Sequence, residues 1–326
     1  MDTCILPFEL DVELKTYQST AFPLGIMKAN LRDYDIWLCN KFIQTTWYNE
    51  GNFSFVPDDN YSVEEGLTTK QNIIVTPENL TAKGINILDF NRSMIARNHY
   101  ILGQYNERFI PHKKAYQRYD FDHGYLIFGY DDRNGVFKSA GYLANGKYNF
   151  FDIKYEDYFK SLVENTIPFA RIHPFRVHDN CSVTLNVPKI KKHLEDYLYS
   201  RWDNPDKLHC GYGVSTWDML LNYVSLNTGD LDLRYGRIYM EHRALMYKRL
   251  QKLTELQYIE DASFAEAFNE NVYIKAQIVF YLFIKHNVSH QKHLTTRILQ
   301  YMSQVNCNER ILLKQIIPKI KLSSNI

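Results

Sequence analysis

The hydrophobic and polar positions of this chain follow two different patterns. In the first half, short apolar runs alternate with turn-forming residues, which indicates strands and short helices joined by turns. Asn134-Gly135 is a strong signal for a tight turn between two such strands. The elements predicted here are a helix beginning near 19–20, a strand at 72–76, a helix at 86–97, strands at 100–105, from 123, from 136 and at 148–153, and a helix at 155–163.

In the second half, apolar residues recur at helical spacing, as in the stripe formed by Leu233, Ile238, Leu245 and Leu250. The pattern predicts helices at 188–199, 215–225, 231–253, 264–286, 294–302 and 310–320. We therefore expect an α+β protein, with a mixed α/β part at 1–165 and a mainly helical part at 166–326. The segment between the two parts is not linker-like in composition, so we expect them to pack as one integrated unit.

Composition narrows the functional classes. The 326 residues are 45% hydrophobic and 23% charged, as in globular proteins, and the net charge of +1 gives no electrostatic footprint for nucleic acid. The five cysteines are odd in number and widely spaced without a CxxC pair, which indicates reduced thiols. The first residues do not resemble a signal peptide, and the longest apolar run, 276–284, is too short to cross a bilayer. We expect a cytoplasmic protein with no membrane partner.

His123 is the candidate general base. It opens an apolar strand that ends in Gly-Tyr-Asp-Asp, and a second strand returns after the turn. Such a base needs a partner that orients it, usually an Asp or Asn on a neighbouring strand. We expect that partner at position 139 or 140, where the chain carries Ser139 and Ala140. The alternative is a structural histidine that caps the strand and bonds a backbone carbonyl.

A nucleophile works best at a helix N-terminus, where the dipole favours a thiolate. The helix expected to carry it begins at 16–20 and has no cysteine there. Ser19 or Thr16 are the candidate hydroxyl nucleophiles, although a hydroxyl needs a stronger base arrangement than a thiol. The alternative for Ser19 is a helix cap. For Cys4 and Cys39, ordinary burial is the favoured interpretation.

The remaining histidine, cysteine and acidic residues do not match a metal site. His173, His178, Cys181 and His209-Cys210 lack the tight paired spacing of zinc ligands. The segment 241–243, Glu-His-Arg, lacks the spacing of a zinc protease, so these charges are expected to cap, pair or bridge helices. No glycine-rich phosphate loop is present. We expect neither a metal nor another cofactor.

Three stretches carry a resemblance to a known family. They are 17–24 (YQSTAFPL), 123–132 (HGYLIFGYDD) with 137–142 and 155–158, and 232–243 (DLRYGRIYMEHR). Together they make the chain resemble the butirosin biosynthesis protein H N-terminal-domain family, whose members often belong to nonribosomal peptide and related natural-product pathways. The resemblance implies a papain-like fold. The namesake moves an acyl group from a carrier-protein thioester to an amine through a cysteine.

His123 matches the family histidine, whereas the family cysteine would fall at 16–19, where this chain has none. The resemblance implies an enzyme of antibiotic or other natural-product biosynthesis, an acyltransferase or cyclase. It would act on a carrier-bound or peptidyl thioester or amide with His123 as base, assisted by Ser19 or Thr16. The implied partners are a carrier protein or peptide synthetase and a small-molecule or peptidyl substrate. The alternative is an inactive papain-like protein that binds a synthetase, carrier protein or intermediate.

Overall fold

The computed structural model describes residues 2–48, 51, 53–55, 68–70, 73–74, 86–164, 171–178, 182–203 and 209–323. Its helices and strands are mixed, which confirms the expected α+β class. The contacts divide the chain into two compact units, each made of two segments. The sheet unit comprises 1–32 and 61–182, and the helical unit comprises 33–60 and 183–326.

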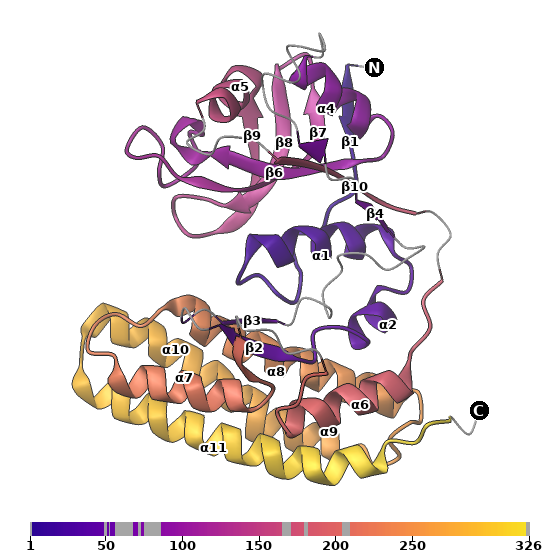
Figure 1. Cartoon of the computed structure of the whole chain (residues 1–326), viewed down its shortest axis with the longest axis vertical. Coiled ribbons are helices and arrows are strands. Elements are labelled where there is room, and N and C mark those ends of the chain that lie inside the picture. The colour runs from indigo at the N-terminus through magenta and orange to yellow at the C-terminus, as the bar shows by residue number, and fades with distance from the viewer. Residues whose placement is uncertain are drawn as a thin grey trace. The chain divides into compact units, whose positions relative to one another are not determined.

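The sheet unit is built on an antiparallel sheet, which has eight strands among the described residues (Figure 1). Their order is β4-β10-β6-β7-β8-β9, with β1 paired to β7 and β5 paired to β10. The strands are β1 (Thr3–Ile5), β4 (Thr68–Lys70), β5 (Ile73–Ile74), β6 (Tyr100–Asn106), β7 (Asp122–Asp131), β8 (Val136–Tyr142), β9 (Tyr148–Lys154) and β10 (Arg171–Val177). Of the strand expected at 72–76, Asn72, Val75 and Thr76 lie outside the described residues.

Helices pack on both faces of this sheet. α1 (Gln18–Asn30) contacts β7, β8 and β10, while α4 (Ile87–Ile95) and α5 (Tyr155–Val163) contact β6, β7 and β9 from the other side (Figure 1). Under α5, the Tyr158 hydroxyl lies 2.7 Å from that of Tyr125 and accepts a hydrogen bond from Asn91. This buried contact links β7 to α4 and α5, and so holds the strand that carries His123.

The helical unit combines a group of packed helices with a small sheet of order β11-β2-β3. The strands are β2 (Thr45–Tyr48), β3 (Phe53–Phe55) and β11 (His209–Tyr212). The helices are α2 (Tyr34–Cys39), α6 (Val187–Leu198), α7 (Ser215–Leu226), α8 (Leu233–Glu255), α9 (Ser263–Phe268), α10 (Ile274–Ser289) and α11 (Lys292–Ile316), with a π turn at Asn269–Tyr273 between α9 and α10.

The helices expected at 294–302 and 310–320 are one continuous helix, α11, followed by a short 3-10 turn. The prediction divided this helix because polar residues interrupt its apolar stripe. Two of them, Asn306 and Glu309, are in fact buried and hydrogen-bonded to other helices. A buried oxygen that accepts hydrogen bonds from another helix does not end its own helix, yet the residue looks like a break in a hydrophobicity pattern.

The two units do not coincide with the expected division into 1–165 and 166–326. Residues 33–60 belong to the helical unit, because β2 pairs with β11 from the second half of the chain. β10 lies beyond residue 165 but belongs to the first sheet, where it pairs with β6. These pairings join residues about 70 to 160 positions apart, which a local pattern does not reveal.

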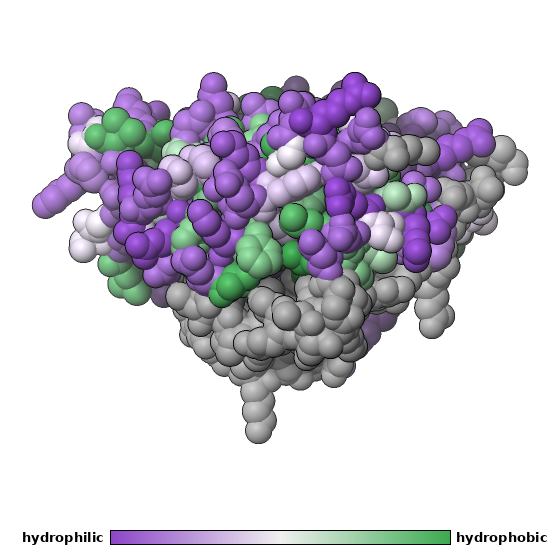
Figure 2. Space-filling view, turned by 90° about the horizontal axis from the view of Figure 1, so that it is seen from above, coloured by the Kyte–Doolittle hydropathy of each residue, from purple (hydrophilic) through white to green (hydrophobic). Residues whose placement is uncertain are grey.

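Figure 2 shows one face, on which hydrophilic residues predominate and hydrophobic ones lie in small groups. Some large apolar side chains are nevertheless exposed in the sheet unit, including Tyr119, Phe121 and Phe159. In the described part of the chain, no helix combines the length and apolar character needed to span a membrane.

Candidate active site around His123

His123 is the second residue of β7 and lies opposite Tyr105 of β6. Its side chain is 40% exposed, so the imidazole has access to solvent while one side of it contacts the protein. The ring of Phe121 lies 5.1 Å from the imidazole, centroid to centroid. The start of β7 therefore presents a histidine that a ligand from solvent can reach.

Glu107 is the orienting partner of this histidine. It begins a 3-10 turn directly after β6, and its Oε1 lies 2.8 Å from Nδ1 of His123. The carboxylate is only 8% exposed, so its hydrogen bond to the ring is shielded from water. A carboxylate at this distance accepts a hydrogen bond from the Nδ1–H group, so that Nε2 is the basic nitrogen.

The partner expected at position 139 or 140 was misplaced. β8 aligns Ala140 with Leu126, so a residue level with His123 would lie three positions later, beyond the end of β8 at Tyr142. Ser139 is buried and donates its hydroxyl proton to the carbonyl of Leu126. The acid comes instead from the β6 side of β7, because β6 ends at Asn106 and the turn that directly follows it points Glu107 at the imidazole.

Lys113 supports Glu107 from the same connection between β6 and β7. Its Nζ lies 3.5 Å from Oε1 of Glu107, and its side chain is 2% exposed. Burial lowers the pKa of Lys113, and the charge of Glu107 opposes that shift. Lys113 also donates to the backbone carbonyl of Tyr142 and lies over the ring of Phe151. The lysine thus fixes the position of the carboxylate against β8.

Gln18, the first residue of α1, is the side chain that this helix brings to the histidine. Its Nε2 lies 3.1 Å from Nδ1 and 3.3 Å from Nε2 of His123, and 3.3 Å from the carbonyl oxygen of Gly124. Its Oε1 accepts the N–H of Tyr142 at 3.0 Å. The position where a helix N-terminus faces the imidazole is therefore filled by an amide, which is not a nucleophile.

These contacts close a ring of polar groups. Lys113 donates a hydrogen bond to the carbonyl of Tyr142, and the N–H of Tyr142 donates to Gln18. Gln18 contacts the imidazole of His123, which is hydrogen-bonded to Glu107. The ion pair of Glu107 with Lys113 completes the ring. Gly141 permits the close approach, because a Cβ there would lie 2.5 Å from Oε1 of Gln18 and 3.1 Å from Nζ of Lys113. Any larger residue at this position would displace two members of the ring.

The candidate hydroxyl nucleophiles are not among the partners of the imidazole. In the described residues, the ring nitrogens hydrogen-bond to Gln18 and Glu107. Ser19 is exposed in the first turn of α1, and Thr16 is half-buried just before the helix. The N-cap of α1 is Tyr17, which makes no side-chain cap bond, so the cap interpretation of Ser19 is wrong.

Neither Cys4 nor Cys39 is a member of this ring of contacts. Cys4 is half-buried in β1, opposite Tyr130 of β7. Cys39 ends α2 in the helical unit, where burial raises the pKa of its thiol and disfavours the reactive thiolate. It lines a cavity of about 190 Å³ between α2 and α8, together with Asp35, Lys248 and Arg249.

The other histidine and cysteine candidates are dispersed. His173 is in β10 of the sheet unit, whereas His209 and Cys210 are in β11 of the helical unit. Cys181 lies outside the described residues. Within the described ranges, no group of three or more His, Cys, Asp or Glu side chains is placed to hold a metal ion.

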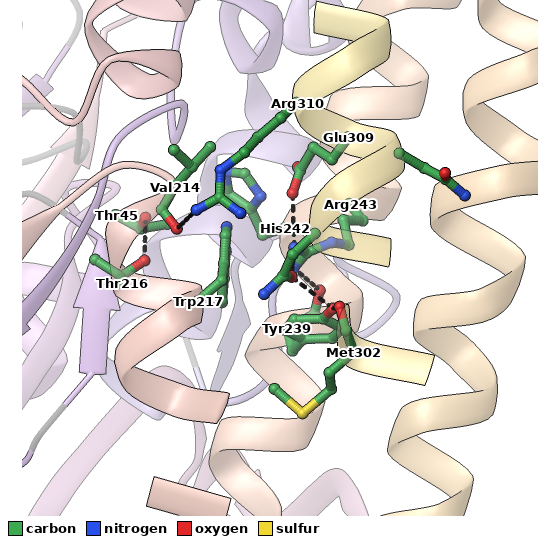
Figure 3. A network of polar contacts seen from close by, with 12 residues as sticks. Thr45, Val214, Thr216, Trp217, Tyr239, His242, Arg243, Met302, Glu309 and Arg310 are labelled. Carbon is green, nitrogen blue, oxygen red and sulfur yellow. Dashed lines mark hydrogen bonds and ion pairs between the residues drawn. The ribbon is translucent and has the colours of Figure 1, made fainter. Parts of the chain in front are cut away.

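The charges at 241–243 pair within a helix or bridge to other elements, as expected. Glu241 pairs with Arg237 one turn earlier, and Nε2 of His242 lies 2.9 Å from the carbonyl oxygen of Ile43. Arg243 bonds Glu309 of α11 at 2.6 Å, and both side chains are almost fully buried (Figure 3).

Aromatic rings complete this network. The guanidinium of Arg243 lies over the rings of Trp217 and Tyr239 (Figure 3). The hydroxyl of Tyr197 donates a hydrogen bond to Glu309. These groups form a structural core with no exposed member, so they do not constitute a site.

Among the described residues, the ring of polar contacts around His123 is thus the arrangement best suited to chemistry. It can accept and return a proton, because the imidazole is oriented by a carboxylate and is accessible from solvent. In the comparisons with known proteins, no family model and no curated protein matches this chain. The family resemblance of the sequence therefore stays a prediction.

Proposed function

We propose that the protein acts on a carrier-bound or peptidyl thioester or amide by acyl transfer or cyclisation, with His123 as general base. The assignment of His123 as the base rests on the 2.8 Å contact between Nδ1 of His123 and Oε1 of Glu107, and on the partial exposure of the imidazole. The substrate class comes from the resemblance to the butirosin biosynthesis protein H family. That resemblance also suggests a carrier protein or peptide synthetase as partner.

A papain-like arrangement is part of this proposal. Its support is that the N-terminus of α1 and the start of β7 meet at Gln18 and His123. In a papain-like enzyme the helix supplies the nucleophile to the histidine, and here it supplies an amide. We therefore assign a reaction without a covalent acyl-enzyme.

In the proposed reaction, Nε2 of His123 removes a proton from an amine of the acceptor. The amine nitrogen attacks the carbonyl carbon of the thioester, so that a C–N bond forms and the C–S bond breaks. The imidazolium returns the proton to the leaving thiolate, and Glu107 stabilises the imidazolium in between. Positioning the two substrates against each other supplies much of the remaining rate.

The second candidate is a binding protein without catalytic activity. It is favoured by the position of Gln18, whose amide nitrogen is within hydrogen-bond distance of both ring nitrogens. An N–H that donates to the imidazole occupies the lone pair that a base must use. In this case His123 would help to hold a ligand, and no bond in that ligand would change.

The test is aminolysis of S-acetyl-N-acetylcysteamine by a primary amine, measured for the native chain and three variants. His123→Ala is expected to lower the rate about 10²- to 10⁴-fold, the usual contribution of a general base. Glu107→Gln keeps a hydrogen-bond acceptor but removes the charge, so a smaller loss is expected. His112→Ala replaces an exposed histidine of the same connection and serves as the control.

Folding of each variant is checked by thermal unfolding. Equal rates for His123→Ala and the native chain would sink the assignment of the base. A native chain that binds the thioester but does not accelerate aminolysis would favour the binding protein.

A further inference from the structure

Two exposed aromatic rings lie beside the imidazole of the candidate site. The ring of Tyr119 is 6.4 Å from that of Phe121, which in turn is 5.1 Å from the imidazole of His123. Tyr119 is 48% exposed and Phe121 is 44% exposed. Two large apolar rings are thus left open to water next to the histidine that we assign as the base.

The backbone that carries these rings is held in place. Asn106 is fully buried, and its Oδ1 accepts the N–H groups of Phe121 and Arg108, which lie on the two arms of the connection between β6 and β7. Its Nδ2 donates to Asp120, and the N–H of Glu107 donates to the carbonyl of Phe121. The same hydrogen bonds therefore fix the backbone of Glu107 and the backbone of Phe121 relative to each other.

From this geometry we infer that Tyr119 and Phe121 form a subsite for an aromatic group of the substrate, adjacent to the carbonyl that reacts at His123. Apolar rings in contact with water carry a hydration cost, and the hydrogen-bonded backbone keeps Phe121 beside the imidazole. A planar aryl group can stack against such rings with little loss of entropy, because the subsite is already ordered. The favoured substrate class is therefore an aryl-acyl thioester or amide.

The choice of thioester probes rests on the proposed function, but the readout is binding and needs no turnover. S-Benzoyl-N-acetylcysteamine and S-acetyl-N-acetylcysteamine are titrated separately while the imidazole resonances of His123 are followed by NMR. The native chain is expected to bind the benzoyl probe more tightly. Phe121→Leu is expected to weaken benzoyl binding roughly two- to tenfold, the range for loss of an aromatic pair, and to leave acetyl binding unchanged.

Phe159→Leu is the matched control, because Phe159 is 49% exposed on α5 of the same unit. It should leave both affinities unchanged. The inference is overturned if the native chain binds both probes equally, if Phe121→Leu leaves their affinity ratio unchanged, or if neither probe moves the His123 resonances. A loss of catalysis in His123→Ala would not alter these outcomes, so the subsite and the proposed reaction can fail separately.

Discussion

His123 can act as a base only when the Gln18 amide no longer donates a hydrogen bond to the lone pair of the ring nitrogen that takes the proton. The amide nitrogen is almost equally distant from both ring nitrogens, so it is not in line with either one. The amide oxygen, in contrast, is anchored by the N–H of Tyr142. A substrate therefore needs to displace only a weak contact to reach the imidazole.

Replacing Gln18 with cysteine is expected to create a reactive thiol. The shorter side chain places sulfur at the first position of a 13-residue helix, facing the imidazole. The helix dipole and a nearby imidazolium both stabilise a thiolate. We expect Gln18→Cys to be alkylated by iodoacetamide with an apparent thiol pKa below the ordinary value of about 8.5. Peptide-resolved mass spectrometry separates this thiol from the native cysteines.

Ser19→Cys is the matched control for this experiment, because Ser19 is exposed in the same helical turn. It shares the helix dipole but not the contact with the ring. Adding His123→Ala to Gln18→Cys should return the thiol pKa toward that of the control. An equally reactive thiol with and without His123 would show that the imidazole does not face this position.

At the scale of elements, α8 and α11 are joined by a buried ion pair. Arg243 and Glu309 are almost inaccessible to water, and their nitrogen and oxygen atoms lie 2.6 Å apart. Burial raises the pKa of Glu309, and the charge of Arg243 opposes this shift. Such a pair fixes which residues of the two helices meet, but its net contribution to stability is small once desolvation is included.

Breaking the pair on one side should be costly and depend on pH. Arg243→Met leaves the carboxyl of Glu309 buried without its cation, so we expect the free energy of unfolding to fall by about 3–5 kcal/mol at neutral pH. A carboxyl with a raised folded-state pKa contributes stability below its unfolded pKa and loses it as the pH rises through the folded value. Urea unfolding of Arg243→Met should therefore show recovery as the pH is lowered.

The double variant Arg243→Met with Glu309→Gln is the control, because it has no carboxyl at this position to titrate. It should be more stable than the single variant at neutral pH and should lack its recovery in acid. Parallel pH profiles for the two variants would contradict the assignment of the recovery to Glu309.

At the scale of the whole molecule, the chain alternates between its two units. Residues 33–60 leave the sheet unit and contribute β2 and β3 to the helical unit, and residue 61 returns to the sheet unit. β10 then completes the sheet from beyond residue 165, between β4 and β6. Neither contiguous half of the chain contains a complete unit.

A polypeptide ending at residue 165 should therefore not fold cooperatively. It lacks β10, so β6 loses one neighbour and β4 and β5 lose the strand that they pair with. Unpaired strand edges of this kind favour aggregation. A polypeptide of residues 1–182 retains β10 and should show a cooperative thermal transition by circular dichroism. Similar cooperative transitions for both polypeptides would mean that β10 is dispensable.

Local pattern was sufficient for the elements whose burial follows a simple period. The strands from Tyr100 to Lys154 and the helices α4, α5 and α8 lie close to where periodicity predicts them. The start of α1 was predicted within two residues, but its cap was not, because the capping position is the aromatic Tyr17. Asn86 does cap α4, as its side chain accepts the N–H of Leu88.

The candidate site was only half visible in the sequence. His123 was found because it opens a strand. Glu107, Lys113 and Gln18 were missed, since neither their spacing nor their type marks them as neighbours of a residue up to 105 positions away. One usable signal was present. The long connection between β6 and β7, which leads to the strand of His123, contains an acid and a lysine, Glu107 and Lys113.

The sequence by itself determined the α+β class, most of the helices and strands and the histidine, because burial on one face imposes a period that residues in order can show. Only the tertiary structure decided the partners of that histidine, the composition of the two units and the continuity of α11. These depend on strand register and on polar groups that are buried with their partners. Both are long-range properties, since one residue of register changes every neighbour while leaving the local pattern unchanged.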